Sequence, residues 1–446
     1  MRKSLLSVAA IGVTALLLSS CAMPADDPNF NNGANGPVLG SEAASAAAAD
    51  QATMTAALAA PTSIGVDAPL PAAPAKGATI ISLTDGSEYQ AVFETALADA
   101  AKVLGWKVES VKVDPADPAA AGTAFDAALA TKPAGIHING AFAEALATNL
   151  AAAETAKVPV VCTGCSGDPA GGITDTSIDG TAQNTEWADA MASYVITNRA
   201  PGEDAAVQVI PSPGGAVADF NLEFETSLNS QCHNCSATES VVDPTTLDLT
   251  DPAAVSAFVV SEMSTSLGAW ALLDTGAMSG GVADALASDP TLLTPVVLIG
   301  RGAAASDVAA LKALGGAAPV ASAGTSASAA PASSVAASPS ADSAAASSAG
   351  SAAPADSAAS GEGAASRTPE QAAALQAWIA IPQPVMAWRV IDQFARIAGG
   401  AELATGPLPS QLLTGSNAGD AVVDDAGNFI GIADYQAQFT KLWGVK

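Results

Sequence analysis

Apolar residues in most of the chain form short runs that alternate with longer amphipathic stretches. The short runs have the length of strands and lie at 78–83, 107–113, 135–139, 158–162, 205–211, 269–274, 295–300 and 377–381. The longer stretches have the length of helices and lie at 88–104, 119–131, 143–157, 181–198, 217–230, 252–264, 303–314 and 385–399. Strands and helices in strict succession predict βαβ units and parallel sheets covered on both faces.

The succession is interrupted near residues 174–180, which divides it into two runs of βαβ units. Each run is long enough for its own doubly wound sheet. The pattern therefore predicts the α/β class, with two parallel-sheet lobes.

Two segments lack any sustained apolar period. Residues 22–76 are rich in Ala, Pro, Asn, Asp and Ser, and in residues 317–366 the four residue types Ala, Ser, Pro and Gly fill 44 of 50 positions. Segments of this kind bury too little apolar surface to offset the entropy of ordering. We expect a disordered tether before the first lobe and a disordered insert inside the second, whose composition also suits O-glycosylation.

The N-terminus carries the features of an export signal. Arg2 and Lys3 form a positive n-region, residues 5–18 form an apolar segment, and the small residues that follow lead into Cys21. This arrangement resembles the lipobox of bacterial lipoproteins, in which the cysteine is lipidated and becomes the mature N-terminus. The alternative is an ordinary signal peptide with an incidental cysteine.

The net charge argues against nucleic-acid binding, and the hydropathy argues against a membrane-spanning helix after residue 20. Sixteen Lys and Arg against 44 Asp and Glu give a net charge of −28, which repels nucleic-acid phosphates. After residue 20 no apolar run reaches the length of a membrane-spanning helix. We therefore expect no nucleic-acid binding, and contact with the membrane through the lipid anchor only.

The order of elements over most of the exported chain resembles the type I periplasmic-binding fold, in particular the sugar-binding lipoproteins of bacterial ABC importers. The segments that carry the resemblance are 80–86 (IISLTDG), 158–161 (VPVV), 271–274 (ALLD), 297–300 (VLIG), 381–384 (IPQP) and 439–444 (FTKLWG). The resemblance implies two lobes joined by a hinge of three segments, near residues 175–181, 383 and 413–421. A ligand cleft is implied between the lobes.

These expectations give a complete division of the chain. Its parts are the signal peptide at 1–20, the lipidated cysteine and tether at 21–76, the N-terminal lobe at 77–178 plus 384–412, and the C-terminal lobe at 179–383 plus 413–446. The insert belongs to the C-terminal lobe.

Ligands of open α/β sheets bind beyond the carboxyl ends of the strands. Six residues at or just after such ends are the candidate ligand-binding residues: Asp85, Tyr89, Asn139, Asp274, Arg301 and Gln383. Asn139 and Asp274 have an alternative role as helix caps. Arg301 favours an anionic or strongly polar ligand if it faces the cleft, and a solvated position at its rim is the alternative. Aromatic candidates for stacking on a sugar ring are Phe142, Trp187, Phe220 and Trp388.

Four cysteines remain after Cys21, in the pairs Cys162 and Cys165 and Cys232 and Cys235. Export to an oxidising compartment favours two local disulfides. The spacing between the pairs is too long for an ordinary zinc ribbon, but a zinc site or a redox role remains the alternative.

No nucleophile elbow, metal-binding HExxH helix or P-loop is present, and the chain has two histidines. The sequence therefore predicts a protein that is not an enzyme and uses no cofactor or metal. We expect a monomeric receptor on the outer face of the cell membrane that delivers a small polar, sugar-like ligand to an ABC permease. The alternatives are a sensor that presents the ligand to a signalling partner and a carbohydrate-binding adhesive protein.

Overall fold

The computed structural model describes residues 40–114, 117, 119–199, 205–212, 215–243, 246–249, 251–266, 268–315 and 368–445. The chain forms two units, Met1–Ala44 and the compact body Ser45–Lys446. Only the beginning of the helix α1 (Gly40–Leu58) is described in the first unit. The expected signal peptide, Cys21 and the insert at 317–366 lie outside the described residues.

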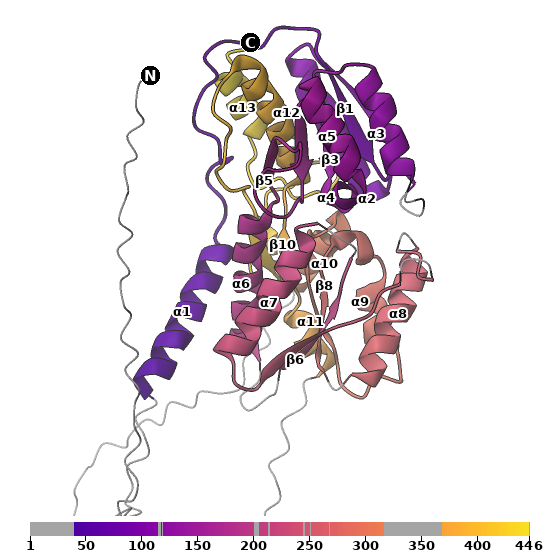
Figure 1. Ribbon diagram of the computed structural model, residues 1–446. Coiled ribbons are helices and arrows are strands. Elements are labelled where there is room, and N and C mark those ends of the chain that lie inside the picture. Colours follow the sequence, from indigo (N-terminus) through magenta and orange to yellow (C-terminus); the bar gives the residue numbers. More distant parts are fainter. Residues whose placement is uncertain are drawn as a thin grey trace, which may run out of the picture. The chain divides into compact units, whose positions relative to one another are not determined.

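The first sheet of the body has five parallel strands in the order β2-β1-β3-β4-β5. Figure 1 labels β1, β3 and β5 of this sheet. They are β1 (Thr79–Thr84), β2 (Lys107–Lys112), β3 (Gly135–Asn139), β4 (Val160–Thr163) and β5 (Asp175–Ile178). The helical segments after them are α2 (Glu88–Val103), α3 (Ala120–Ala130), α4 (Gly140–Ala143), η1 (Glu144–Leu146) and α5 (Ala147–Ala156). Ile80 and Ile81 pack into different apolar cores, so both faces of the sheet are buried.

The second sheet has six strands in the order β11-β10-β9-β8-β6-β7. They are β6 (Ala205–Ile210), β7 (Cys235–Glu239), β8 (Trp270–Leu273), β9 (Val297–Arg301), β10 (Ala377–Ala380) and β11 (Gln411–Thr414), and β11 alone runs antiparallel to its neighbour. The accompanying helical segments are α6 (Thr181–Asn198), α7 (Val217–Gln231), α8 (Pro252–Thr265), η2 (Gly276–Met278), α9 (Val282–Ser288), α10 (Ala305–Gly315), α11 (Pro369–Ala374) and η3 (Ala418–Asp420). Leu272 and Leu273 again pack into different cores.

The two sheets confirm the α/β class and the two parallel-sheet lobes. We call the first sheet and its helices the N-terminal lobe and the second the C-terminal lobe. The chain leaves the first sheet after β5, leaves the second after β10 to form α12 (Gln383–Gly399), and returns to the second sheet at β11.

The C-terminal helix differs from the division that the sequence suggested. Residues 413–446 were expected in the C-terminal lobe, but α13 (Tyr435–Trp443) packs on α12, which lies against α2. The Trp388 and Trp443 rings stack with 5.3 Å between their centroids, and Trp443 Nε1 donates to Asp392 Oδ1 over 2.9 Å. Residues 411–412, which were expected in the N-terminal lobe, belong to β11 of the second sheet. Burial of these aromatic rings explains why the last helix joins α12.

The structure also differs from the expectation of a disordered tether at 21–76, in the second half of that segment. The helix α1 ends at Leu58, and beyond it Ile64 and Leu70 are buried in the core that includes α12. Alanine has the highest helix propensity, so an alanine-rich stretch without an apolar stripe can still form a helix. The few apolar residues after it are scattered, and they are buried individually rather than as one face.

Three strands that the pattern does not predict have clear reasons for being missed. The strand β7 lies at an edge of the sheet and is mostly exposed, β5 carries polar residues, and β11 is only four residues long. None of them shows the continuous apolar run of a central parallel strand.

The cysteines are joined as expected, Cys162 to Cys165 and Cys232 to Cys235.

In the part of the chain that the structure describes, no helix is both long enough and apolar enough to cross a bilayer. Within the same residues, no three His, Cys, Asp or Glu side chains are grouped so that they could hold a metal ion.

Candidate functional site

A cavity of about 340 Å³ lies at the carboxyl ends of β8, β9 and β10, where α2 of the N-terminal lobe meets the C-terminal lobe. Its walls come from α2, from the loops after β8 and β9, and from the segment that leads into α12. The lining residues are Tyr89, Val92, Pro252, Gly276, Ala277, Ser279, Gly280, Ala303, Ala304, Ala305, Ser306, Ile381, Gln383, Pro384, Asn428 and Phe429. This is the edge of the sheet at which the sequence placed the ligand.

Two of the six candidate residues, Tyr89 and Gln383, line this cavity from different segments. The Tyr89 hydroxyl lies against Gly302, the residue after β9. Burial raises the pKa of Tyr89, although the Arg301 charge and the Gln383 side chain act against this. The Oε1 atom of Gln383 is buried and has no hydrogen-bond partner among the described residues. A buried amide oxygen of this kind is available to accept a hydrogen bond from a ligand.

Asp274 lies directly after β8 and is completely buried. Its Oδ2 atom accepts hydrogen bonds from Ser212 N over 2.7 Å and from Asn221 Nδ2 over 2.9 Å. Burial raises the pKa of Asp274 to about 6, and the hydrogen bonds from Ser212 and Asn221 and the Arg301 charge oppose this rise. Asp274 Oδ1 and Asn221 Oδ1 are buried without partners in the described part of the chain.

Asn221 was not predicted from the sequence. It lies inside α7 rather than after a strand, so the rule of strand ends does not identify it. An amide in the middle of a helix with few other polar residues on its buried side is the signal that could have done so.

Arg301 is not available to an anionic ligand in this structure. Its guanidinium forms an ion pair with Asp179, and its Nε atom donates to Asn184 Oδ1 over 2.8 Å. The Trp187 ring covers it, with 5.4 Å from Cζ to the ring centroid. Burial alone would lower the pKa of Arg301, but the Asp179 charge and hydrogen bond outweigh burial and raise it. The expectation of an anionic ligand therefore loses its basis, because the charge of Arg301 is already balanced.

Asp179 has a feature that the sequence alone does not show. Its φ angle is +56°, a left-handed conformation that is uncommon for a residue other than glycine. Its position after β5 brings it to Arg301, 122 residues later in the chain. The interruption near 174–180 was visible in the sequence, but this long-range pairing was not.

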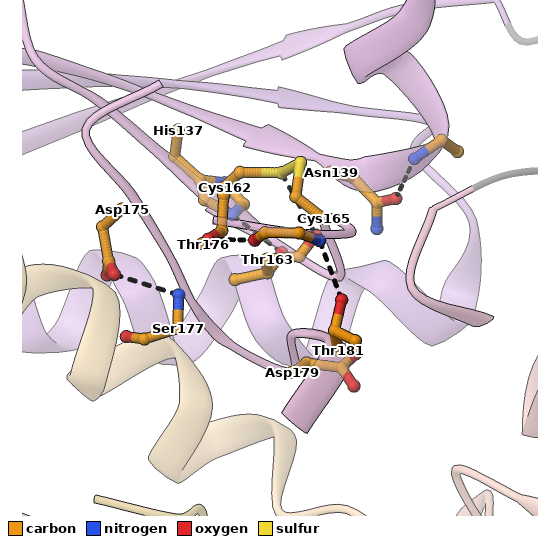
Figure 2. Close-up of a disulfide and its surroundings, with 12 residues drawn as sticks. His137, Asn139, Cys162, Thr163, Cys165, Asp175, Thr176, Ser177, Asp179 and Thr181 are labelled. Carbon is orange, nitrogen blue, oxygen red and sulfur yellow. Dashed lines mark hydrogen bonds between the residues drawn. A yellow bond between two sulfur atoms is a disulfide. The ribbon is translucent and has the colours of Figure 1, made fainter. Parts of the chain in front are cut away.

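The other two candidate residues act locally in the structure. Asp85 Oδ1 accepts from Ser87 N over 2.8 Å, and Asn139 caps α4 by accepting from Ala141 N over 2.9 Å (Figure 2). Neither residue lines the cavity between the lobes. The capping alternative therefore describes Asn139, while Asp274 binds a loop amide and a side chain instead.

The four aromatic residues outside the candidate set are mainly packing residues. Phe142 and Phe220 are buried in apolar cores, and Trp388 stacks on Trp443 in the N-terminal lobe. Trp187 contacts Arg301 and lines a different cavity, which is described below. A large aromatic side chain in a core contributes apolar contact area and is not a stacking surface for a ligand.

The lobes contact each other through backbone at the loop of the first disulfide. Ala216 N, at the beginning of α7, donates to Gly164 O over 2.7 Å. Gly164 lies between Cys162 and Cys165, which form a disulfide at the end of β4 (Figure 2). A Cβ atom on Gly215 would lie 2.5 Å from Gly164 O, so only glycine permits this approach. The lobes are thus in direct contact in this structure.

A buried polar chain runs beneath this loop and explains His137. Its Nδ1 atom lies 2.8 Å from Ser82 Oγ and its Nε2 atom 3.1 Å from Thr163 Oγ1, and Ser82 Oγ donates to Glu94 Oε1 over 2.7 Å. Burial lowers the pKa of His137 to about 3. Ser82, His137 and Thr163 are at most 4% exposed, so they form a structural network in the core.

Asp307 connects two loops of the cavity. Its Oδ2 atom accepts from Ser279 Oγ and from Ala304 N, each over 2.8 Å, and both donors line the cavity. Burial raises the pKa of Asp307 to about 6, against these two hydrogen bonds. The unfolded chain has an ordinary carboxyl pKa near 4, so the folded state binds the proton more tightly.

This difference predicts a pH dependence of stability that the Asp307→Asn variant should lack. The contribution of Asp307 is fully present below pH ~4 and is lost as the pH rises through about 6. The free energy of unfolding of the wild type, minus that of Asp307→Asn, should therefore decrease between these values. Urea unfolding of both proteins at each pH measures this difference. Asp274 and His137 are present in both proteins, so their contributions to the pH dependence cancel. A difference in the free energy of unfolding that does not change with pH would contradict the prediction.

Comparisons with known proteins identify the fold. No protein-family model matches the chain. No curated protein matches it either. A Mycobacterium smegmatis ABC transporter solute-binding protein solved with glycerol has a TM-score of 0.54 and 14% identity, covering 79% of this chain and 99% of its own.

Two further solved structures agree. A glucose-galactose binding protein from Geobacillus stearothermophilus has a TM-score of 0.52 and 10% identity, covering 77% of this chain and 99% of its own. An Agrobacterium vitis ABC transporter solute-binding protein solved with allitol has a TM-score of 0.52 and 13% identity, covering 77% and 98%. This chain therefore has the type I periplasmic-binding fold found in the solute-binding proteins of ABC transporters.

Proposed function

We propose that this protein is an extracytoplasmic solute-binding protein of an ABC importer and that it binds a small, neutral, polyhydroxylated ligand. The observation that carries the proposal is the cavity of about 340 Å³ between the lobes: Gln383 lines it, and the Oε1 atom of this residue is buried without a hydrogen-bond partner among the described residues. Solved structures of the same fold hold glycerol and allitol. Binding rather than catalysis is the role that we assign to the site.

The chemistry of the free polar atoms supports a hydroxylated ligand. Gln383, which lines the cavity, has a free acceptor in Oε1 and so needs a hydrogen-bond donor; Asp274 Oδ1 and Asn221 Oδ1 are also free acceptors, but their residues do not line the cavity. Hydroxyl groups are such donors. A carboxylate or phosphate offers none when ionised, and the nearby guanidinium of Arg301 is already paired with Asp179. We therefore propose a sugar or a polyol, and not a sugar acid.

Ligand binding should raise the melting temperature, because only the folded protein binds the ligand. We expect a shift with at least one of glycerol, allitol, glucose and galactose, and none with glucuronate. When the free ligand concentration is about 100 times the dissociation constant, binding stabilises the folded protein by about 2.7 kcal/mol.

Measuring the melting temperature of two glutamine variants at increasing ligand concentrations locates the site. Gln383→Ala should weaken binding by about five- to 100-fold, which corresponds to the loss of one buried hydrogen bond. Gln436→Ala removes an exposed glutamine on α13 and should leave affinity unchanged. Equal affinities for both variants would place the ligand elsewhere, and no shift with any neutral compound would contradict the proposed ligand class.

We also propose that Cys21 carries a lipid that anchors the protein to the outer face of the cell membrane. The order of positive residues, apolar segment and cysteine supports this. Cys21→Ala should move the protein from the membrane fraction to the soluble fraction, and continued membrane fractionation would contradict anchoring. Loss of uptake of the identified ligand on deletion of the gene would support delivery to a permease rather than a sensory role.

A further inference from the structure

Residues 58–70, which we call the strap, pass from one lobe to the other outside the three crossings described above. The strap begins on the C-terminal lobe. Leu58 O accepts a hydrogen bond from Gln411 Nε2 over 2.9 Å and another from Asn417 Nδ2 over 3.1 Å. Gln411 is the first residue of β11, which pairs with β10 in the second sheet.

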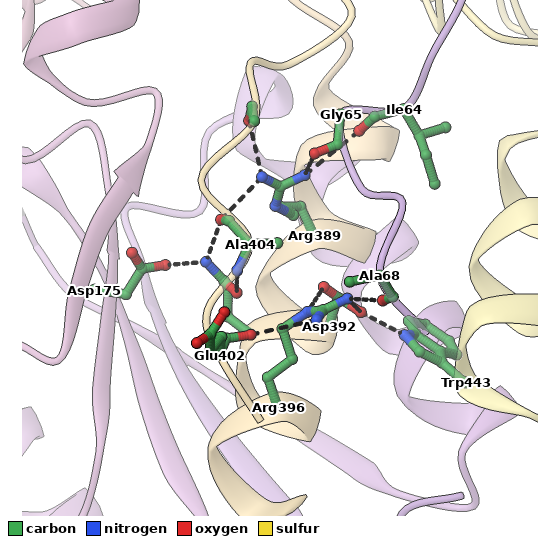
Figure 3. A network of polar contacts seen from close by, with 12 residues as sticks. Ile64, Gly65, Ala68, Asp175, Arg389, Asp392, Arg396, Glu402, Ala404 and Trp443 are labelled. Atoms are coloured by element: carbon green, nitrogen blue, oxygen red, sulfur yellow. Dashed lines mark hydrogen bonds and ion pairs between the residues drawn. The ribbon is translucent and has the colours of Figure 1, made fainter. Parts of the chain in front are cut away.

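The strap ends on the N-terminal lobe. Arg396 Nη2, from α12, donates to Ala68 O over 2.7 Å (Figure 3). Leu70 N donates to Leu442 O of α13 over 2.8 Å. Leu70 and Ile64 are buried in the same core as α12. Both ends of the strap are therefore fixed to the protein, one end in each lobe.

The middle of the strap lies against the segment that joins α12 to β11. Arg389 Nη1 donates to Gly65 O over 2.8 Å, and its Nη2 donates to Ala404 O and Gly406 O over 2.9 and 2.8 Å (Figure 3). Gly65 has a φ of +73°, and a Cβ atom there would lie 2.0 Å from Pro407 O. One guanidinium thus ties the strap to a crossing between the lobes.

A cavity of about 570 Å³ separates part of the strap from α6 and from the crossing at 407–412. Trp187 lines it, and its Nε1 donates to Ser410 Oγ over 2.7 Å. The strap therefore contacts the hinge at defined points and is not packed against it along its whole length. Open space at this position leaves room for the hinge segments to move beneath it.

We propose that the strap is a fourth connection between the lobes and that it favours the arrangement in which they are in contact. Separation of the lobes moves the anchor at Leu58 relative to the anchors at Ala68 and Leu70. A chain segment held at both ends resists such movement unless a hydrogen bond at one anchor breaks. The length of the strap and the strength of its anchors therefore set part of the free energy that is needed to separate the lobes. This inference does not depend on the identity of the ligand.

The amide of Ala216 reports opening directly, because its hydrogen-bond acceptor is Gly164 O of the other lobe. Its hydrogen exchange is measured by NMR on the full chain without ligand. In the test variant, Gly-Ser-Gly-Ser is inserted between Pro61 and Thr62, which slackens the strap and leaves its anchors in place. In the control, the same four residues are inserted after Thr291, in an exposed loop of the C-terminal lobe. Gln411→Met is a second test variant, since it removes one donor to Leu58 O.

Insertion in the strap should accelerate exchange at Ala216 by about fivefold or more, the effect of losing one net hydrogen bond. Gln411→Met should act in the same direction, and the control insertion should leave the rate within about twofold of wild type. Rates within about twofold of wild type in both strap variants, or slower exchange, would overturn the proposal. If the strap insertion does not fold, Gln411→Met decides by the same criterion.

Discussion

Arg389→Met should lower the free energy of unfolding by about 1 to 3 kcal/mol. Arg389 is only 2% exposed, and its guanidinium donates to the backbone carbonyls of Gly65, Ala404 and Gly406. Methionine fills a similar volume but donates no hydrogen bond. The variant would leave three carbonyls without this donor, although Ala404 O keeps the hydrogen bond from Gln393 Nε2. Urea unfolding, followed by circular dichroism, measures the change.

Two further variants show whether the loss comes from the hydrogen bonds. Arg389→Lys keeps the charge but cannot reproduce the planar set of donors, so its stability should lie between those of the wild type and Arg389→Met. Lys441→Met removes a cation from an exposed position on α13 and should change stability by less than about 0.5 kcal/mol. A loss below about 1 kcal/mol for Arg389→Met would show that water or other groups satisfy the carbonyls.

Ala216→Pro should weaken ligand binding by about ten- to 100-fold while the protein stays folded. Ala216 has a φ of −67°, which proline also adopts, and it precedes the first residue of α7. The φ angle at this position is therefore compatible with proline. It removes the N–H that donates to Gly164 O over 2.7 Å and places a ring carbon against that oxygen. Contact between the lobes should be lost, and with it the closed site.

Calorimetry with the ligand found in the thermal screen measures this effect. Ala216→Gly is the matched control, because it keeps the N–H donor and removes only the methyl group. Its affinity should remain within about threefold of wild type. Wild-type affinity in Ala216→Pro, with an unchanged melting temperature in the absence of ligand, would mean that binding does not require this contact.

The sequence predicts the interior of this fold better than its edges. Central strands such as β4 and β8 are buried throughout, so their apolar residues form uninterrupted runs. The strand β7 is an exposed edge strand, and β11 is paired on its inner side by four residues only, so neither has such a run. The strap was missed for a similar reason, because its carbonyls are bound by Arg389 and Arg396 from far along the chain.

The candidate site was predicted in part. Strand ends locate Asp274, Arg301 and Gln383 because the topology of a parallel sheet places these ends at one edge. The partners of these residues depend on long-range pairing, which the sequence pattern does not contain. Asp179 balances the charge of Arg301, and Asn221 reaches Asp274 from the middle of a helix. The Asp179 contact removes the reason that Arg301 gave for expecting an anionic ligand, and the sugar-like ligand stays our proposal.

The disulfide between Cys162 and Cys165 encloses Gly164, the residue whose carbonyl the other lobe binds. This position has a practical consequence for the preparation of the protein. Material produced in a reducing cytoplasm lacks this cross-link. We expect such a preparation to bind ligand more weakly, because the loop that presents Gly164 to the other lobe is no longer cross-linked. Secretion, or oxidative refolding followed by a thiol assay, is therefore the appropriate starting point for any search for the ligand.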